Sequence, residues 1–100
     1  MNGEEEMTTL TSVDNILTER GNTYGAFVTQ AEIAQDFKDL ALRYIKHHDK
    51  TLKPDQREAL DMIFSKIGRI LNGNPDYSDS WTDIAGYAKL VADRLDGTPR

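Results

Sequence analysis

The sequence predicts an all-α fold, a compact bundle of three to four helices. Apolar residues recur at i, i+3 and i+4 spacing in several segments, and no segment shows sustained alternation of apolar and polar residues. Three prolines (Pro54, Pro75 and Pro99) stand where helices could begin or where the chain should turn. Because 100 residues suit a single domain, these observations together favour one helical unit.

Each expected helix has its own start or stop signal. Thr11 or Ser12 would cap the first helix, GNTYG would end it, Pro54 would open the third, and DGTPR would stop the fourth. The helices are expected over about 13–20, about 26–48, from 54 to the NGNP turn at 72–75, and from that turn to about 95. The domain organisation then has three parts: a disordered acidic tail over 1–10, one helical domain over 11–96 and a frayed C-terminus over 97–100.

Composition excludes several classes of protein. No apolar run approaches the ~20 residues that span a membrane, and the N-terminal MNGEEEMTTL lacks the basic region of a secretory signal. The chain has no cysteine, which excludes disulfides and thiolate ligands and fits a reducing cytoplasm. A net charge of −5 argues against direct binding of DNA or RNA backbones. We therefore expect a cytoplasmic protein with no membrane partner.

Acidic residues form two like-charged pairs. On a helical wheel of the third helix, Glu58 and Asp61 share one face, and the opposite arc holds the expected core stripe: Leu60, Ile63, Phe64, Ile67, Ile70 and Leu71. Asp79 and Asp83 form the second pair, on the fourth helix. If the two helices pack antiparallel, the four carboxylates would converge on an all-oxygen site suited to Mg²⁺ or Mn²⁺.

A capping interpretation of the same acids stays open. Carboxylates in a first helical turn are stabilised by the helix dipole, and Ser80-x-x-Asp83 resembles a capping box with Asp in place of Glu. Gly68 and Gly86 lie inside helices, where their conformational cost requires either close helix packing or room for a ligand.

Three sequence blocks carry a resemblance to a known family. LTERGNTYGAF (17–27), REALDMIFSKIGRILNGNPDY (57–77) and DSWTDIAGYAKLV (79–91) resemble small, functionally uncharacterised proteins of tailed bacteriophages and prophages. The layout is more distantly similar to the all-α, MazG-like nucleoside triphosphate pyrophosphohydrolases. That superfamily binds Mg²⁺ with an E-x-x-E and an E-x-x-D pair, which this chain replaces with Glu58-x-x-Asp61 and the wider Asp79-x-x-x-Asp83.

The distant similarity implies roles for particular side chains. Lys66 and Arg69 would contact phosphates, and Tyr24 and Trp81 would stack on a base. Arg20 and Tyr87 complete the set of substrate-binding residues that it implies. For three of these residues a structural alternative stays open: Arg20 compensating the dipole of the first helix, Tyr24 covering a helix junction, and Trp81 packing in the core beside Ala85, Ala88 and Ala92.

Two functions follow from these observations. The first is a phage-encoded nucleotide-binding protein, acting as a Mg²⁺-dependent nucleoside triphosphate pyrophosphohydrolase through a metal-bound water. The alternative is a host-takeover or anti-defence protein that binds a host protein or sequesters a nucleotide without catalysis. Members of the MazG-like superfamily commonly assemble as dimers or tetramers, so the resemblance also implies a homo-oligomer.

Overall fold

The computed structural model describes residues 3–100, with side chains described from Ser12 onward. Four helices account for most of this range: α1 (Gly3–Tyr24), α2 (Phe27–His47), α3 (Pro54–Asn72) and α4 (Ser78–Leu95). No strand occurs within residues 3–100, so the predicted all-α class is confirmed. In the same range, no helix is long and apolar enough to cross a membrane.

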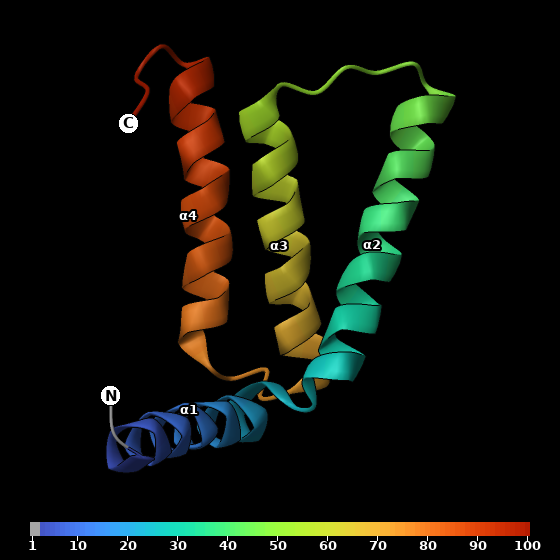
Figure 1. Cartoon of the computed structure of the whole chain (residues 1–100). Helices are drawn as coiled ribbons and strands as arrows, with labels where there is room; N and C mark the ends of the chain where they lie inside the picture. The colour runs from blue at the N-terminus through green and yellow to red at the C-terminus, as the bar shows by residue number, and fades with distance from the viewer. Residues whose placement is uncertain (1–2) are drawn as a thin grey trace.

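The helices α2, α3 and α4 form an antiparallel bundle with α3 in the middle (Figure 1). The helix α4 lies along one side of α3, and α2 lies along the other side and diverges from α3 toward the α2–α3 loop. The first helix, α1, crosses beneath the end of the bundle where α2 begins and α3 ends. It packs against α2 and α3 only, among the helices that the structure describes.

Local signals set most helix boundaries close to the predicted positions. Pro54 occupies the first turn of α3, where its missing N–H is no loss, and the Lys53 backbone N–H donates to Gln56 Oε1 over 2.8 Å. Gly25, with φ of 77°, provides the left-handed turn between α1 and α2. The first helix differs from its prediction, because it begins at Gly3 rather than near Val13. The side chains of the predicted tail lie outside the described residues.

Small residues and stacked rings join α2 to α3. The Phe37 and Phe64 rings stack with centroids 5.9 Å apart. One turn further along α3, a Cβ added to Gly68 would lie 2.9 Å from the Gln30 carbonyl oxygen and 3.6 Å from the Ala34 Cβ. Close approach of two helices is therefore the reason for a glycine at position 68.

Two ion pairs fix the register of α3 against α4. Lys66 Nζ lies 3.0 Å from Asp83 Oδ2, and Arg94 donates two hydrogen bonds of 2.7 Å to the Asp55 carboxylate. The pairs are three helical turns apart on both helices, as antiparallel packing requires. Of the buried apolar residues of α3, Ala59 lies between the two pairs and Ile70 lies one turn beyond Lys66.

The core differs from the predicted stripe. Because α3 packs against helices on two different sides, its buried residues are Ala59, Lys66, Gly68 and Ile70. Of the stripe residues, Ile70 is buried, whereas Leu71 is 62% exposed. The prediction of Leu71 as a core residue was therefore wrong.

Candidate functional site

The turn between α1 and α2 packs against the end of α3. Asn72 Nδ2 donates to the carbonyl oxygens of Tyr24 (2.8 Å) and Ala26 (2.9 Å), and the Asn74 N–H donates to the Thr23 carbonyl over 2.7 Å. The backbone of Gly73 lies so close to Thr23 and Tyr24 that a Cβ would overlap them. Two segments that are distant in sequence, GNTYG and NGNP, thus form one structural unit.

A cavity of about 530 Å³ lies beside this unit, at the junction of α1, α2 and α3. Its walls combine apolar side chains with two guanidinium groups and an amide, and they consist of Leu17, Arg20, Gly21, Tyr24, Gly25, Ala26, Phe27, Gln30 and Arg69. A concave, mostly apolar surface with a few convergent polar groups is typical of a small-molecule site.

Arg69 is the most informative side chain of this cavity. Its guanidinium carbon lies 4.5 Å from the centroid of the Tyr24 ring, a cation–π arrangement. Its Nε is buried and has no hydrogen-bond partner in the structure. Since a buried charged donor without a partner is costly, an acceptor supplied from outside the chain would stabilise it.

The first turn of α2 adds positive potential to the same cavity. Ala26, the N-cap residue, provides no side-chain hydrogen bond, and no acidic residue stands in the first turn. Ala26, Phe27 and Gln30 all line the cavity, so the positive end of the helix dipole lies at its wall. A helix N-terminus and two arginines together favour an anion.

Tyr24 also contacts the aromatic ring of Tyr77. The Tyr77 ring packs edge-on against it with centroids 5.9 Å apart. Tyr77 in turn donates a hydrogen bond from its hydroxyl to Asp79 Oδ2 over 3.1 Å. This hydrogen bond, together with the negative charge of Asp79, raises the pKa of Tyr77. Tyr24 thus contacts both Arg69 and Tyr77 at the junction of α1 and α2, as the structural alternative expected.

The structure brings together half of the predicted substrate-binding residues. Arg20, Tyr24 and Arg69 line one cavity, whereas Lys66 is 11% exposed and pairs with Asp83. Tyr87 lines a groove between α3 and α4, away from the three.

Trp81 is neither in the cavity nor in the core. Its side chain donates from Nε1 to the Pro75 carbonyl over 2.8 Å, and the residue is 55% exposed. The prediction that Trp81 packs in the core was therefore wrong, and no contact places it beside Tyr24 or Arg69.

The four predicted metal ligands do not form one cluster within the chain. Glu58 lines the groove between α3 and α4, and Asp61 lines the groove between α2 and α3. The register places Asp79 opposite the end of α3 near Ile70, which is 12 residues or roughly 18 Å along the helix from Glu58. Among the described residues, no three His, Asp or Glu side chains are grouped to hold a metal ion. Metal binding by these four carboxylates stays a prediction.

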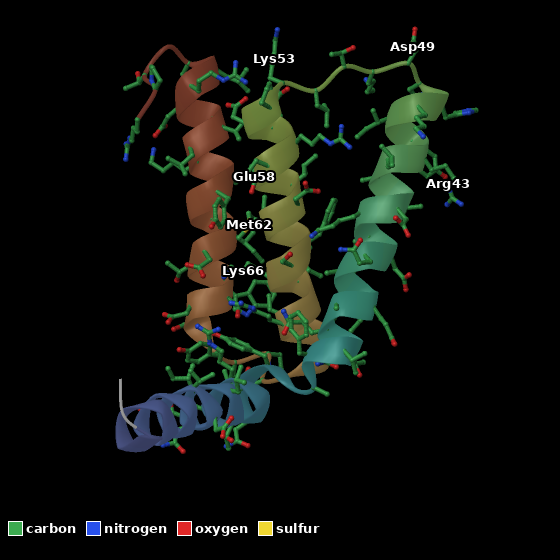
Figure 2. All side chains as sticks on the ribbon, viewed as in Figure 1. Arg43, Asp49, Lys53, Glu58, Met62 and Lys66 are labelled. Atoms are coloured by element: carbon green, nitrogen blue, oxygen red, sulfur yellow. The ribbon has the colours of Figure 1, made fainter. Side chains whose placement is uncertain are left out.

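Figure 2 shows where Glu58 lies relative to other side chains of α3. Three residues of α3 lie one above another between α3 and α4: Glu58, Met62 and Lys66. The neighbour of Asp83 is Lys66 and not a second carboxylate.

The capping alternative was wrong for Asp83. The helix α4 begins at Ser78 with Tyr77 as its N-cap, and Ser80 is 4% exposed inside the helix. The partner of Asp83 is a lysine of the neighbouring helix.

Sequence reasoning missed four residues of this region. Leu17, Phe27 and Gln30 line the cavity, and Asn72 ties the turn to the end of α3. The glycines at 25 and 73 were the available signal, since both allow the close backbone contacts of this unit.

The fold and the cavity define a small, all-helical protein with a cavity of about 530 Å³ at a helix junction. The chain belongs to the family described as "Domain of unknown function (DUF6378)", whose model matches residues 8–95. It is also 34% identical over 86 residues to the Gene 55 protein of Mycobacterium phage D29. That alignment covers 82% of this chain and 52% of the phage protein, so the chain spans about half the length of this relative. No solved structure matches the chain.

These matches confirm the predicted resemblance at the level of a phage protein family. They do not bear on the more distant similarity to the MazG-like enzymes, which stays a prediction.

Proposed function

We propose that this protein binds a nucleotide in the cavity between α1, α2 and α3. The observation that carries the proposal is the buried Arg69 Nε, which has no hydrogen-bond partner among the described residues; the guanidinium group lies over the Tyr24 ring. A phosphate oxygen would satisfy this donor with a charge-assisted hydrogen bond. The α2 N-terminus and Arg20 would attract the same negative charge.

The apolar part of the cavity supports a ligand that also has a flat, apolar portion. Leu17, Phe27 and Tyr24 provide that surface, and a volume of about 530 Å³ lies within the usual range for small-molecule sites. A base attached to a phosphate combines both properties. A free inorganic anion would leave the apolar walls unused.

Hydrolysis is the further step that the distant resemblance implies. Mg²⁺ or Mn²⁺ would have to be held by Glu58, Asp61, Asp79 and Asp83, and the register of α3 and α4 separates these residues. The residues of one chain therefore do not fit a single metal ion, and binding without turnover is the function that the geometry supports best. Sequestering a nucleotide would need no metal.

Isothermal titration with a panel of nucleoside mono- and triphosphates, with and without Mg²⁺, tests the proposal. We expect Arg69→Gln to weaken binding roughly 10- to 100-fold, the value of a hydrogen bond to a charged group. Arg43→Gln is the matched control, because Arg43 also lies over a tyrosine ring, 5.6 Å from the Tyr44 centroid, but outside the cavity. The proposal would be refuted if Arg69→Gln and Arg43→Gln bound the nucleotides with equal affinity. It would also be refuted if the wild type bound none of them.

A pyrophosphate-release assay on the same nucleotides decides between binding and hydrolysis. If wild-type protein releases pyrophosphate with Mg²⁺ and both Asp61→Asn and Asp79→Asn abolish release, the enzyme hypothesis replaces simple binding. The host-protein alternative predicts instead a stoichiometric partner in pull-downs from host lysate, retained by the Arg69→Gln variant.

A further inference from the structure

Positive charge gathers at one end of the molecule, where α2 ends and the loop to α3 follows. Residues 43–53 contain four cations and one acid, a net charge of +3, whereas the whole chain has a net charge of −5 and its other residues therefore carry −8. The four cations are all exposed, and together we call them the basic end: Arg43, Lys46, Lys50 and Lys53. In Figure 1 the end of α2 and the α2–α3 loop lie at the opposite end of the bundle from α1 and from the cavity beside it.

Acids of the chain do not neutralise the basic end. No ion pair joins any of its four cations to an acid among residues 12–100. Asp39 and Asp49 are the nearest acids on α2 and the loop, and Asp55, the first acid of α3, is engaged by Arg94 of α4. The positive charge of this end is therefore available to a partner.

The dipoles of the two helices explain only part of this charge. Lys46 stands in the last turn of α2, where a cation offsets the negative end of the dipole. Arg43 precedes that turn. Lys53 is the N-cap residue of α3, where the positive end of the dipole disfavours a cation. A negatively charged partner would stabilise both of these residues.

Aromatic rings lie among the cations. The guanidinium carbon of Arg43 is 5.6 Å from the centroid of the Tyr44 ring, and the rings of Tyr44 and His48 lie within 18° of parallel with centroids 6.2 Å apart. His47 meets His48 edge-on, with centroids 5.1 Å apart. All of these side chains are exposed, Tyr44 to 53%. Figure 2 shows Arg43 pointing away from α3, so the row of rings and cations faces solvent.

We infer that the basic end, together with Tyr44 and His48, binds single-stranded nucleic acid without regard to sequence. Surfaces with this activity combine cations that follow the phosphate backbone with aromatic rings on which the bases stack. A duplex, an acidic protein or an anionic membrane would use the cations and leave the rings without a role, because none of them offers an unstacked base. A single strand uses both.

The net charge of the whole chain does not prevent this contact. Charges in solution are screened over a Debye length of about 8 Å at physiological salt, so the charge near the bound phosphates has the largest effect. That local charge is positive at the basic end. The inference does not depend on nucleotide binding in the cavity.

Fluorescence anisotropy with labelled oligothymidylate and oligouridylate of about 16 nucleotides tests the inference. We expect the wild type to bind at low salt, and a preference between the two strands identifies the sugar that it accepts. The double variant Lys46→Gln, Lys50→Gln should flatten the slope of log affinity against log salt by about 1.4, since each phosphate contact on a single strand contributes about 0.7. The matched control is Lys89→Gln with Arg100→Gln, which removes the same charge around Asp93 and should keep the wild-type slope.

Substitutions of Tyr44 separate stacking from charge. Tyr44→Leu should weaken binding roughly 5- to 150-fold, the value of one base stacked on an aromatic ring. Tyr44→Phe keeps the ring and should keep the wild-type affinity. Arg43→Gln should also weaken binding of the oligonucleotide and Arg69→Gln should not, which is the reverse of their expected effects on nucleotides in the cavity. Circular dichroism of each variant establishes that it is folded.

Three results would overturn the inference. One is a wild type that binds neither oligonucleotide at low salt. Another is equal affinity of Tyr44→Leu and Tyr44→Phe, which would show that no base stacks there. The last is binding to duplex DNA, polyglutamate or phosphatidylserine vesicles as tight as binding to the single strands, since this would assign the basic end to negative charge alone.

Discussion

The Lys66 ammonium group and the Asp83 carboxylate lie 3.0 Å apart and join α3 to α4. The two partners differ in exposure: the Lys66 side chain is 11% exposed and that of Asp83 is 47% exposed. The pair explains how Asp83 is tolerated four residues after Asp79. The cation that offsets the repulsion comes from a neighbouring helix and is absent from the local sequence of α4.

The unequal exposure of this pair predicts unequal effects of removing either partner. Asp83→Ala should lower the free energy of unfolding by about 1–3 kcal/mol, because it leaves a nearly buried ammonium group without a partner. Lys66→Met should cost less, since it keeps the apolar stem in place and leaves a carboxylate that water can reach. Urea unfolding of the two variants measures both values. A larger loss for Lys66→Met than for Asp83→Ala would contradict the assignment of Lys66 as the buried partner.

The two glycines inside helices should respond to alanine in opposite directions. At Gly68 a Cβ would lie 2.9 Å from the Gln30 backbone oxygen, which cannot move without separating α2 from α3. Gly68→Ala should therefore destabilise the protein by roughly 1–3 kcal/mol. At Gly86 an added Cβ would meet no other described part of the chain within 4 Å apart from the adjacent backbone of α4, so Gly86→Ala should stabilise α4 by up to about 1 kcal/mol. Thermal unfolding of both variants gives the signs. A stabilised Gly68→Ala would show that α2 and α3 are not in close contact there.

Three of the four helices could be predicted within one or two residues because their ends are specified locally. Pro54, Gly25 and the NGNP turn act on the backbone where they stand. The packing of α3 could not be predicted in the same way. A single helical wheel assumes one buried side, whereas α3 contacts α2 on one side and α4 on another. Lys66, a charged residue, is buried as a result, and Leu71 is exposed.

The candidate site was predictable only in part, because its residues are brought together by packing between helices that no local pattern specifies. Arg20 and Tyr24 were named from a conspicuous turn, but their proximity to Arg69 depends on contacts across more than 40 residues, including the Asn72 hydrogen bonds. The separation of Glu58 from Asp79 depends on the register of α3 and α4. That register follows from the ion pairs, which no local pattern reveals.

The Asp55–Arg94 pair predicts a loss of stability toward acid pH. Its hydrogen bonds from Arg94 lower the pKa of Asp55 and raise that of Arg94. A carboxyl whose pKa is lower in the folded state stabilises the fold above its unfolded pKa, and this contribution is lost as pH falls through the folded pKa. A double-mutant cycle of Asp55→Asn and Arg94→Gln should therefore show favourable coupling at neutral pH. The coupling should vanish as the pH falls below the ordinary Asp range, roughly 5 to 3.

Urea unfolding at each pH gives the four free energies of this cycle. The same coupling at neutral and at acid pH would contradict the prediction, because it would mean that the charge of Asp55 contributes nothing to the pair.

Asn72 should matter to both the stability and the ligand affinity of the protein. Its amide donates to the carbonyls of Tyr24 and Ala26, and it thereby holds the turn that carries Tyr24 against the end of α3. Asn72→Ala removes both hydrogen bonds and should cost about 1–3 kcal/mol of unfolding free energy.

If the cavity binds a nucleotide, the same variant should also weaken binding, because Tyr24 would no longer be fixed beside Arg69. Asn22→Ala is the matched control, since Asn22 is exposed on α1 and lies outside the cavity lining. Urea unfolding and nucleotide titration of both variants separate the two effects. A variant at Asn72 that loses stability but keeps full nucleotide affinity would show that the position of Tyr24 is not what the ligand requires.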